Sequence, residues 1–320
     1  MNTNFNTIEF LKKLFTFLET VGGRDKLAKL LQYGSKILGY MFEQQQLALK
    51  LMMSETNTSL VHSKEYFLSR SDALSKYISK ANTFDVSIAQ ARKVFRMLKF
   101  IPGYIAVYQF LQKLYALQNP HGKAPSITLH EVLSTGSKFF MANYFTFDTL
   151  NWLAKMGVLF EPRKPGYAKS ESRAKVFVVD WLNNGRLADF GKYSNYSWFY
   201  GLLLTIAADV VTMINLFKKE LKLLTEIHKE VSNQTNVSMD AALSENSNQL
   251  ASYERSQSLQ YELDQLYHQR NMLGLAFVKN LADMGIAANL VNIISINKGY
   301  MGVCGCISAI IGWYELWPKK

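Results

Sequence analysis

A charge-free segment near the C-terminus constrains this chain more than any other feature. Residues 299–314 read GYMGVCGCISAIIGWY and contain no charged side chain. As an α-helix, at about 1.5 Å per residue, the segment reaches most of the way across a hydrocarbon core of about 30 Å. The sequence therefore predicts a membrane-crossing helix here. The alternative is a buried C-terminal helix of a soluble helical protein.

Small residues recur four positions apart within this segment. Glycines weaken a helix in water, but in lipid they let two helix backbones approach closely. The pattern predicts that two copies of the chain associate through one small-residue face, formed by Gly302, Gly305, Ala309 and Gly312. Trp313 and Trp317 stand where an aromatic belt would lie at the membrane surface.

Composition limits how much of the chain can lie in lipid. Hydrophobic residues make up 48% of the 320 residues, so only a few segments can cross a membrane. The net charge of +11 predicts attraction to an anionic partner. Because no zinc-finger or RNA-recognition signature is present, acidic phospholipids are favoured over nucleic acid. The two cysteines, Cys304 and Cys306, are too close for an easy disulfide and do not indicate an oxidising compartment.

Apolar residues recur at helical spacing through most of the chain. The pattern predicts an all-α, membrane-associated helical bundle with amphipathic interfacial helices and one or two transmembrane helices near the C-terminal half. The expected parts are an N-terminal amphipathic helical region (1–118), an aromatic-rich helical region (119–160), a basic insertion or loop (161–197), a candidate first membrane helix with its extension (198–230), a polar loop (231–260) and C-terminal helices with the glycine-rich membrane segment (261–320).

The candidate first membrane helix contains a single charge. Residues 198–217 read WFYGLLLTIAADVVTMINLF, interrupted only by Asp209. An ionisable side chain at mid-bilayer costs about 3 kcal/mol, and about eight favourable side chains at about 0.3–0.6 kcal/mol each can offset that cost. A buried helix of a soluble bundle is the alternative.

No catalytic arrangement is visible in the sequence. The five histidines are dispersed, and neither a metal-binding helix motif nor a phosphate-binding glycine loop occurs. We therefore expect neither an enzyme, nor a cofactor, nor a metal site.

Residues 86–101 predict an amphipathic helix that lies in the membrane surface. Val94 and Leu98 belong to its apolar face and would act as a wedge between lipids. A basic residue near an anionic surface contributes about 1 kcal/mol. The alternative is a surface helix packed on its own protein, which gives the same pattern. The basic face, expected to contact lipid phosphates, consists of Arg92, Lys93, Arg96 and Lys99.

Four blocks of sequence, in order, resemble the peroxin-11 family. The first reads TVGGRDKL at 20–27 and is followed by LQY at 31–33, and the second reads ARKVFRMLK at 91–99. The third combines DTLNW at 148–152 with Gly157 and Val158, and the fourth combines KNLADM at 279–284 with GVCG at 302–305 and Trp317. The resemblance spans nearly the whole chain, with 161–196 and 231–260 as apparent insertions.

This resemblance implies an integral protein of the peroxisomal (or glycosomal) membrane. Members of the family bend and elongate that membrane before division, self-associate, and help to recruit a fission adaptor and a dynamin-like GTPase. The motif residues Gly23, Arg24, Asp25 and Lys26 are expected to cap or lock the N-terminal helices, or simply to form a solvated helix start.

A channel for small metabolites is the second functional hypothesis, since some members of the family have been proposed to form pores. Polar residues interrupt the apolar segments, and such residues either line water or bond to a neighbouring helix. They are Asp209, Asn215, Asn289 and Asn292.

Overall fold

The computed structural model describes residues 7–55, 61–118, 126–156, 186–237 and 246–318, and in these ranges all regular secondary structure is helical. This confirms the predicted all-α class. The helices are α1 (Thr7–Glu19), α2 (Val21–Glu55), α3 (Val61–Arg96), α4 (Phe100–Gln118), α5 (Leu129–Lys155), α7 (Arg186–Val237), α8 (Asn246–Leu290) and α9 (Lys298–Leu316).

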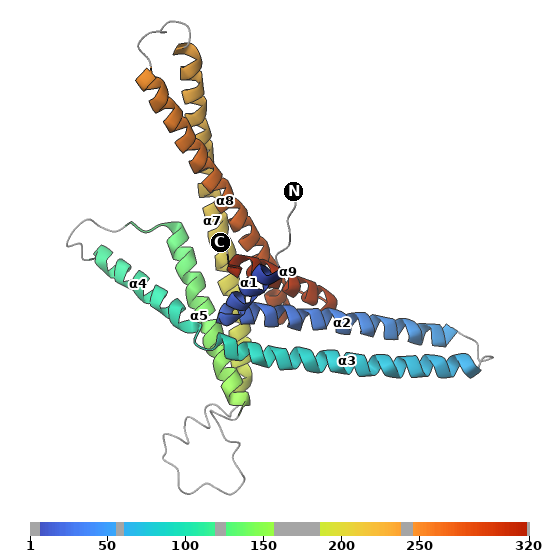
Figure 1. Cartoon of the computed structure of the whole chain (residues 1–320). Helices are drawn as coiled ribbons and strands as arrows, with labels where there is room; N and C mark the ends of the chain where they lie inside the picture. Colours follow the sequence, from blue (N-terminus) through green and yellow to red (C-terminus); the bar gives the residue numbers. More distant parts are fainter. Residues whose placement is uncertain (1–6, 56–60, 119–125, 157–185, 238–245, 319–320) are drawn as a thin grey trace, which may run out of the picture.

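Three helical hairpins radiate from a shared centre, where α1 and α9 lie (Figure 1). Polar contacts fix the register of the α2–α3 hairpin, in which Lys36 pairs with Asp85 at 2.5 Å. The α7–α8 hairpin is held by Arg270, whose Nη1 lies 2.8 Å from Glu220 Oε2. In the third hairpin, α4–α5, the helix α5 packs against α7, while α4 lies on the side of α5 away from α7 (Figure 1).

The helix α7 extends into the predicted polar loop at 231–260, and α8 begins within it. The loop prediction was therefore wrong for residues 231–237 and 246–260, and residues 238–245 lie outside the described part. No glycine or proline occurs from 231 to 260 to stop a helix. A small apolar core also joins the two helices, formed by Leu216, Leu223 and Leu266.

The predicted amphipathic helix over 86–101 is interrupted. α3 ends at Arg96, α4 begins at Phe100, and Leu98 between them has φ of 69°. A proline ring collides with the carbonyl four residues earlier in a helix and donates no hydrogen bond to it. Pro102 therefore prevents a regular helix through Leu98, and the chain bends there instead.

The helix α7 is the one helix in the described part that is long and apolar enough to cross a membrane, within Asp189–Glu230. Only 17% of its most apolar stretch is buried inside the chain, unlike the core helix of a soluble protein. α9 is not apolar enough to meet the same criterion, so of the two predicted crossings the structure favours the one at 198–217, in α7. The crossing by residues 299–314 stays a prediction.

The small-residue face of α9 packs against α2 of the same chain. Ser308 and Ala309 are almost fully buried, and a Cβ added to Gly302 would lie 2.6 Å from Ile37. A Cβ on Gly305 would overlap the ring of Tyr33. Self-association through Gly302, Gly305, Ala309 and Gly312 stays a prediction, and it would require α2 to leave this face.

Replacing Gly305 by alanine tests the contact between α2 and α9. The added methyl group must displace the Tyr33 ring, so we expect G305A to lower the free energy of unfolding by about 1–3 kcal/mol. Gly34 is the matched control, because a Cβ there meets nothing within 4 Å. G34A should be neutral or raise stability by up to about 1 kcal/mol. Denaturant titration in detergent, followed by circular dichroism, measures both, and equal effects would contradict the packing.

Candidate functional site

A cluster of charged side chains lies where α2, α3 and α5 meet, and we call it the charge junction. It contains every cation of the predicted lipid-binding face. Its members are Asp25, Gln32, Arg92, Lys93, Arg96, Lys99, Tyr144 and Asp148.

Asp25 holds the first half of the charge junction. Its carboxylate accepts hydrogen bonds from Arg92 Nε at 3.1 Å and from Lys99 Nζ at 3.0 Å. Arg92 also donates to Gln32 Oε1 at 2.6 Å, and only 8% of Arg92 is exposed. Burial by itself would raise the pKa of Asp25, but the charges of Arg92, Lys99 and Arg96 outweigh it and lower that pKa below its ordinary value. Asp25 is therefore a buried carboxylate that stays ionised.

Asp148 holds the second half, from α5. Its carboxylate lies 3.2 Å from Lys93 Nζ and 3.4 Å from Arg96 Nη2. Arg96 also donates to the hydroxyl of Tyr144 at 2.5 Å. Burial raises the pKa of Tyr144, so its hydroxyl keeps its proton. These contacts tie the end of α3 to the middle of α5.

The junction orients the amphipathic segment with its cations inward. Arg92, Lys93, Arg96 and Lys99 all pair with carboxylates of the same chain, whereas Val94 and Leu98 are 50% and 57% exposed. The basic face of residues 86–101 therefore packs on the protein itself, as in the alternative to a helix lying on the membrane surface. Lipid contact by the four cations stays a prediction, and it would require their pairs with Asp25 and Asp148 to open.

The signature residues 23–26 form the centre of this packing. Gly23 permits the tight turn from α1 to α2, because a Cβ there would overlap the carbonyl of Phe17. The guanidinium of Arg24 lies 5.8 Å from the centre of the Phe95 ring. Lys26 lies across Gly312 of α9, at 2.7 Å from the position of a Cβ. Asp25 is buried rather than solvated, and the role of residues 23–26 as a cap or lock stays a prediction.

A second buried ion pair joins α2 to α8 and α9, and sequence reasoning did not single it out. Lys29 Nζ donates to Asp283 Oδ1 and to Ser308 Oγ, each at 2.7 Å. Lys279 and Glu315 pair nearby, between α8 and α9. The available signal was Asp283 in an otherwise apolar stretch of α8, since a charge in such a place needs a partner.

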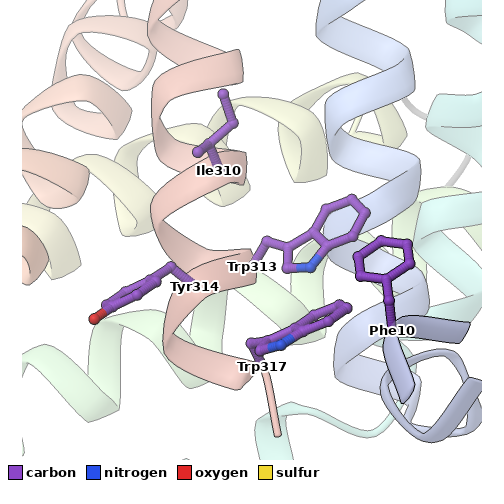
Figure 2. Close-up of a pocket in the computed structure, with 5 residues that line it drawn as sticks. All are labelled: Phe10, Ile310, Trp313, Tyr314 and Trp317. Carbon is purple, nitrogen blue, oxygen red and sulfur yellow. The ribbon is translucent and has the colours of Figure 1, made fainter. Parts of the chain in front are cut away.

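Aromatic side chains close the contact between α1 and α9. Phe17 stacks on Trp313 with ring centres 5.0 Å apart, and Phe10 lies 5.7 Å from Trp317. Figure 2 shows Trp313 and Trp317 on the Phe10 side of α9 and Tyr314 on another side. They line an apolar pocket of about 340 Å³. The two tryptophans expected in a membrane belt therefore also hold α1 in place.

Comparison with known proteins identifies the family. The model of the family peroxisomal biogenesis factor 11 (PEX11) matches residues 11–62, 64–182 and 173–317. The chain belongs to the PEX11 family. It is a peroxisomal membrane protein, of a family of peroxisome biogenesis proteins that are not known as enzymes.

Relatives match along almost their whole length. A peroxisomal membrane protein 11 homolog of Dictyostelium discoideum is 27% identical over 99% of this chain and 97% of its own. The peroxisomal membrane protein PMP30B of Candida boidinii is 27% identical over 95% of this chain and 93% of its own. Peroxisomal membrane protein 11-4 of rice is 24% identical over 97% of both chains. No solved structure matches.

Replacing Asp25 tests the charge junction of this PEX11-family protein. D25A leaves Arg92 and Lys99 without their carboxylate, and breaking a buried pair in this way costs about 3–5 kcal/mol. The stabilisation by Asp25 is present above its unfolded pKa of about 3.8 and is lost as the pH falls through its lower folded value. Denaturant titration between pH 3 and 7 measures both effects. The control D189A breaks the exposed Lys192 pair and should change stability by less than about 0.5 kcal/mol.

Replacing Lys26 should raise the free energy of unfolding, whereas replacing Asp25 should lower it. Burial, followed by the charges of Lys29 and Lys279, lowers its pKa from 10.5 to about 8. Between about pH 8 and pH 10.5 the unfolded chain binds more protons at Lys26 than the folded chain does. The destabilisation caused by burying Lys26 therefore decreases as the pH rises. We expect K26M to raise the free energy of unfolding by about 1–3 kcal/mol at pH 7, and less as the pH passes 8. The exposed control K222M should show neither effect.

Proposed function

We propose that this PEX11-family protein curves and elongates the peroxisomal membrane before division, as a membrane-inserted scaffold and not as an enzyme. One observation supports this most strongly. Apolar side chains project outward at the α3–α4 bend, while the cations of the same segment are fixed inside the protein. Val94, Leu98 and Ile101 are 50%, 57% and 43% exposed.

These side chains form a wedge suited to one leaflet of a bilayer. A fully buried large apolar side chain gains about 1.5–3 kcal/mol over an exposed one, and less in the interface. Insertion expands the leaflet that it enters and so favours curvature. The charge junction makes the wedge stiff, because it connects α3 to α2 and α5, and α5 packs on the membrane helix α7.

Self-association and recruitment complete the proposal. Small residues of α9 are covered by α2, so an association through α9 would use its outer side chains Val303, Ile307 and Ile310, which are 45%, 40% and 56% exposed. A fission adaptor and a dynamin-like GTPase are the partners that the family resemblance implies. Co-sedimentation of these purified proteins with proteoliposomes tests recruitment, and their absence from the pellet would contradict it.

The channel hypothesis receives less support. Asn280 of α8 donates to Asp209 Oδ2 at 2.8 Å, and Asn289 Oδ1 accepts from the Ile296 amide at 2.9 Å. Asn292 has φ of 61°, a conformation that asparagine tolerates better than most residues. These polar residues thus have roles within the fold. Planar-bilayer conductance that disappears in D209L would favour a channel.

Replacing Leu98 by asparagine tests the wedge without disturbing the bend. Asparagine tolerates a positive φ, so L98N should fold as well as the parent. It removes an apolar side chain from the proposed lipid contact, and we expect membrane affinity to fall by about tenfold. Tubulation of liposomes rich in acidic lipid, counted by electron microscopy, should fall with it.

The matched control for this experiment is L51N, on the distant part of the α2–α3 hairpin. Leu51 is 56% exposed, as Leu98 is 57% exposed, but it lies far from the bend. Equal tubulation by L98N and the parent, or equal loss in L51N, would contradict the wedge. Arg92→Glu is unsuitable because it would break a buried pair and unfold the junction.

A further inference from the structure

We infer that α4 lies in the hydrocarbon layer beside α7, as a second lipid-facing helix that forms a membrane hairpin with α5. The inference rests on the proposed placement of α7 in the bilayer. The outer side of α4 is the contact surface, and the acyl chains of phospholipids are its partner.

The exposure of α4 is the first observation. None of its 19 residues is buried, and large apolar side chains project outward along its length, with the exposed amides of Gln109 and Gln112 between them. A contiguous apolar surface of this kind marks a contact with another molecule or with a membrane. The projecting side chains are Ile101 (43% exposed), Ile105 (51%), Tyr108 (62%), Leu111 (55%) and Tyr115 (68%).

The polar groups of α4 give the second observation, because two of them are turned toward α5. Lys113 is the only charged residue from Phe100 to Gln118, and its Nζ lies 2.6 Å from Glu131 Oε1. The hydroxyl of Tyr104 donates to Asn143 Oδ1 at 2.8 Å. Pairing of this kind lowers the cost of placing a charge near lipid.

The register of the helices sets the depth of α4. A Cβ on Gly103 would lie 2.8 Å from Ala142 Cβ, and Lys113 pairs with Glu131, so α4 runs antiparallel to α5. The same part of α5 packs on the apolar stretch of α7, where the hydroxyls of Ser137 and Thr205 are 2.5 Å apart.

A second contact fixes α7 at the same level along α5: Gly201 of α7 adjoins Met141 of α5. Residues 103–113 of α4 therefore lie at the depth of the apolar segment 198–217. At about 1.5 Å per residue, α4 is about 29 Å long, close to the thickness of a hydrocarbon core. It is less apolar than α7, the one described helix apolar enough to cross a membrane by itself, so we place α4 in lipid only as the partner of α5 and α7.

One exposed charge, that of Lys138, lies at this depth, where lipid contact would be unfavourable. Lys138 of α5 is exposed, one residue from Ser137 and thus near the level of Thr205. Seven residues separate Thr205 from the aromatic end of the apolar segment at Trp198, a distance of about 10 Å. The flexible stem of a lysine can carry its ammonium most of that way to the headgroups.

Depth-dependent fluorescence quenching tests the placement. Single cysteines replace Leu111 in α4, Leu203 in α7 and Leu51 in α2, in a background with C304S and C306S. The three leucines are matched, since they are 55%, 48% and 56% exposed. Each variant of the full chain is labelled with an environment-sensitive fluorophore and reconstituted in phosphatidylcholine liposomes with acidic lipid. Brominated acyl chains and aqueous iodide serve as the two quenchers.

We expect the label at 111 to be quenched by brominated lipid as strongly as the label at 203, and the label at 51 to be quenched by iodide. Iodide quenching at 111 with lipid quenching at 203 would overturn the inference and leave the α7 span intact. Iodide quenching at both positions would overturn the inference and the membrane placement of α7 together. None of these readouts depends on curvature, so failure of the wedge is measured separately.

Discussion

The carboxylate of Asp25 accepts hydrogen bonds from Arg92 and Lys99, which stand on either side of the α3–α4 bend. Because Asp25 belongs to α2, this contact fixes where the α2–α3 hairpin meets the rest of the chain. Asp148 repeats the arrangement from α5 with Lys93 and Arg96. The direction of α4, and with it the outward position of Leu98, follows from these two carboxylates.

This protein buries several charged and polar side chains besides its apolar cores, and it exposes many large apolar side chains. Buried polar residues include Asp25, Lys29, Arg92 and Ser308, while leucines and isoleucines on α4, α7 and α9 are exposed. Hydrogen bonds and ion pairs hold helices together well where lipid removes the hydrophobic difference between inside and outside. This arrangement suits the placement proposed above, in which the wedge, α7 and the outer side of α9 contact lipid.

Helical periodicity predicted most of the helices, the long apolar run predicted the candidate membrane helix α7, and four ordered motifs indicated the family, because each of these signals lies in the local sequence. The Pro102 break was also accessible, since proline disrupts the helix four residues earlier. The orientation of the basic face could not be predicted from the sequence, because a helical wheel separates two faces without saying which one is buried. That depends on Asp25, which is 67 residues from Arg92 in sequence. The packing of α9 on α2 depends in the same way on Tyr33, more than 250 residues away.

The paired helices α7 and α8 continue well past the apolar stretch of α7. From Lys218 to Val237, α7 adds 20 residues, or about 30 Å, and pairs with α8 through Glu220 with Arg270 and Glu230 with Arg255. With the apolar stretch of α7 in lipid, as proposed, this paired extension carries the far end of α7 well clear of the headgroups.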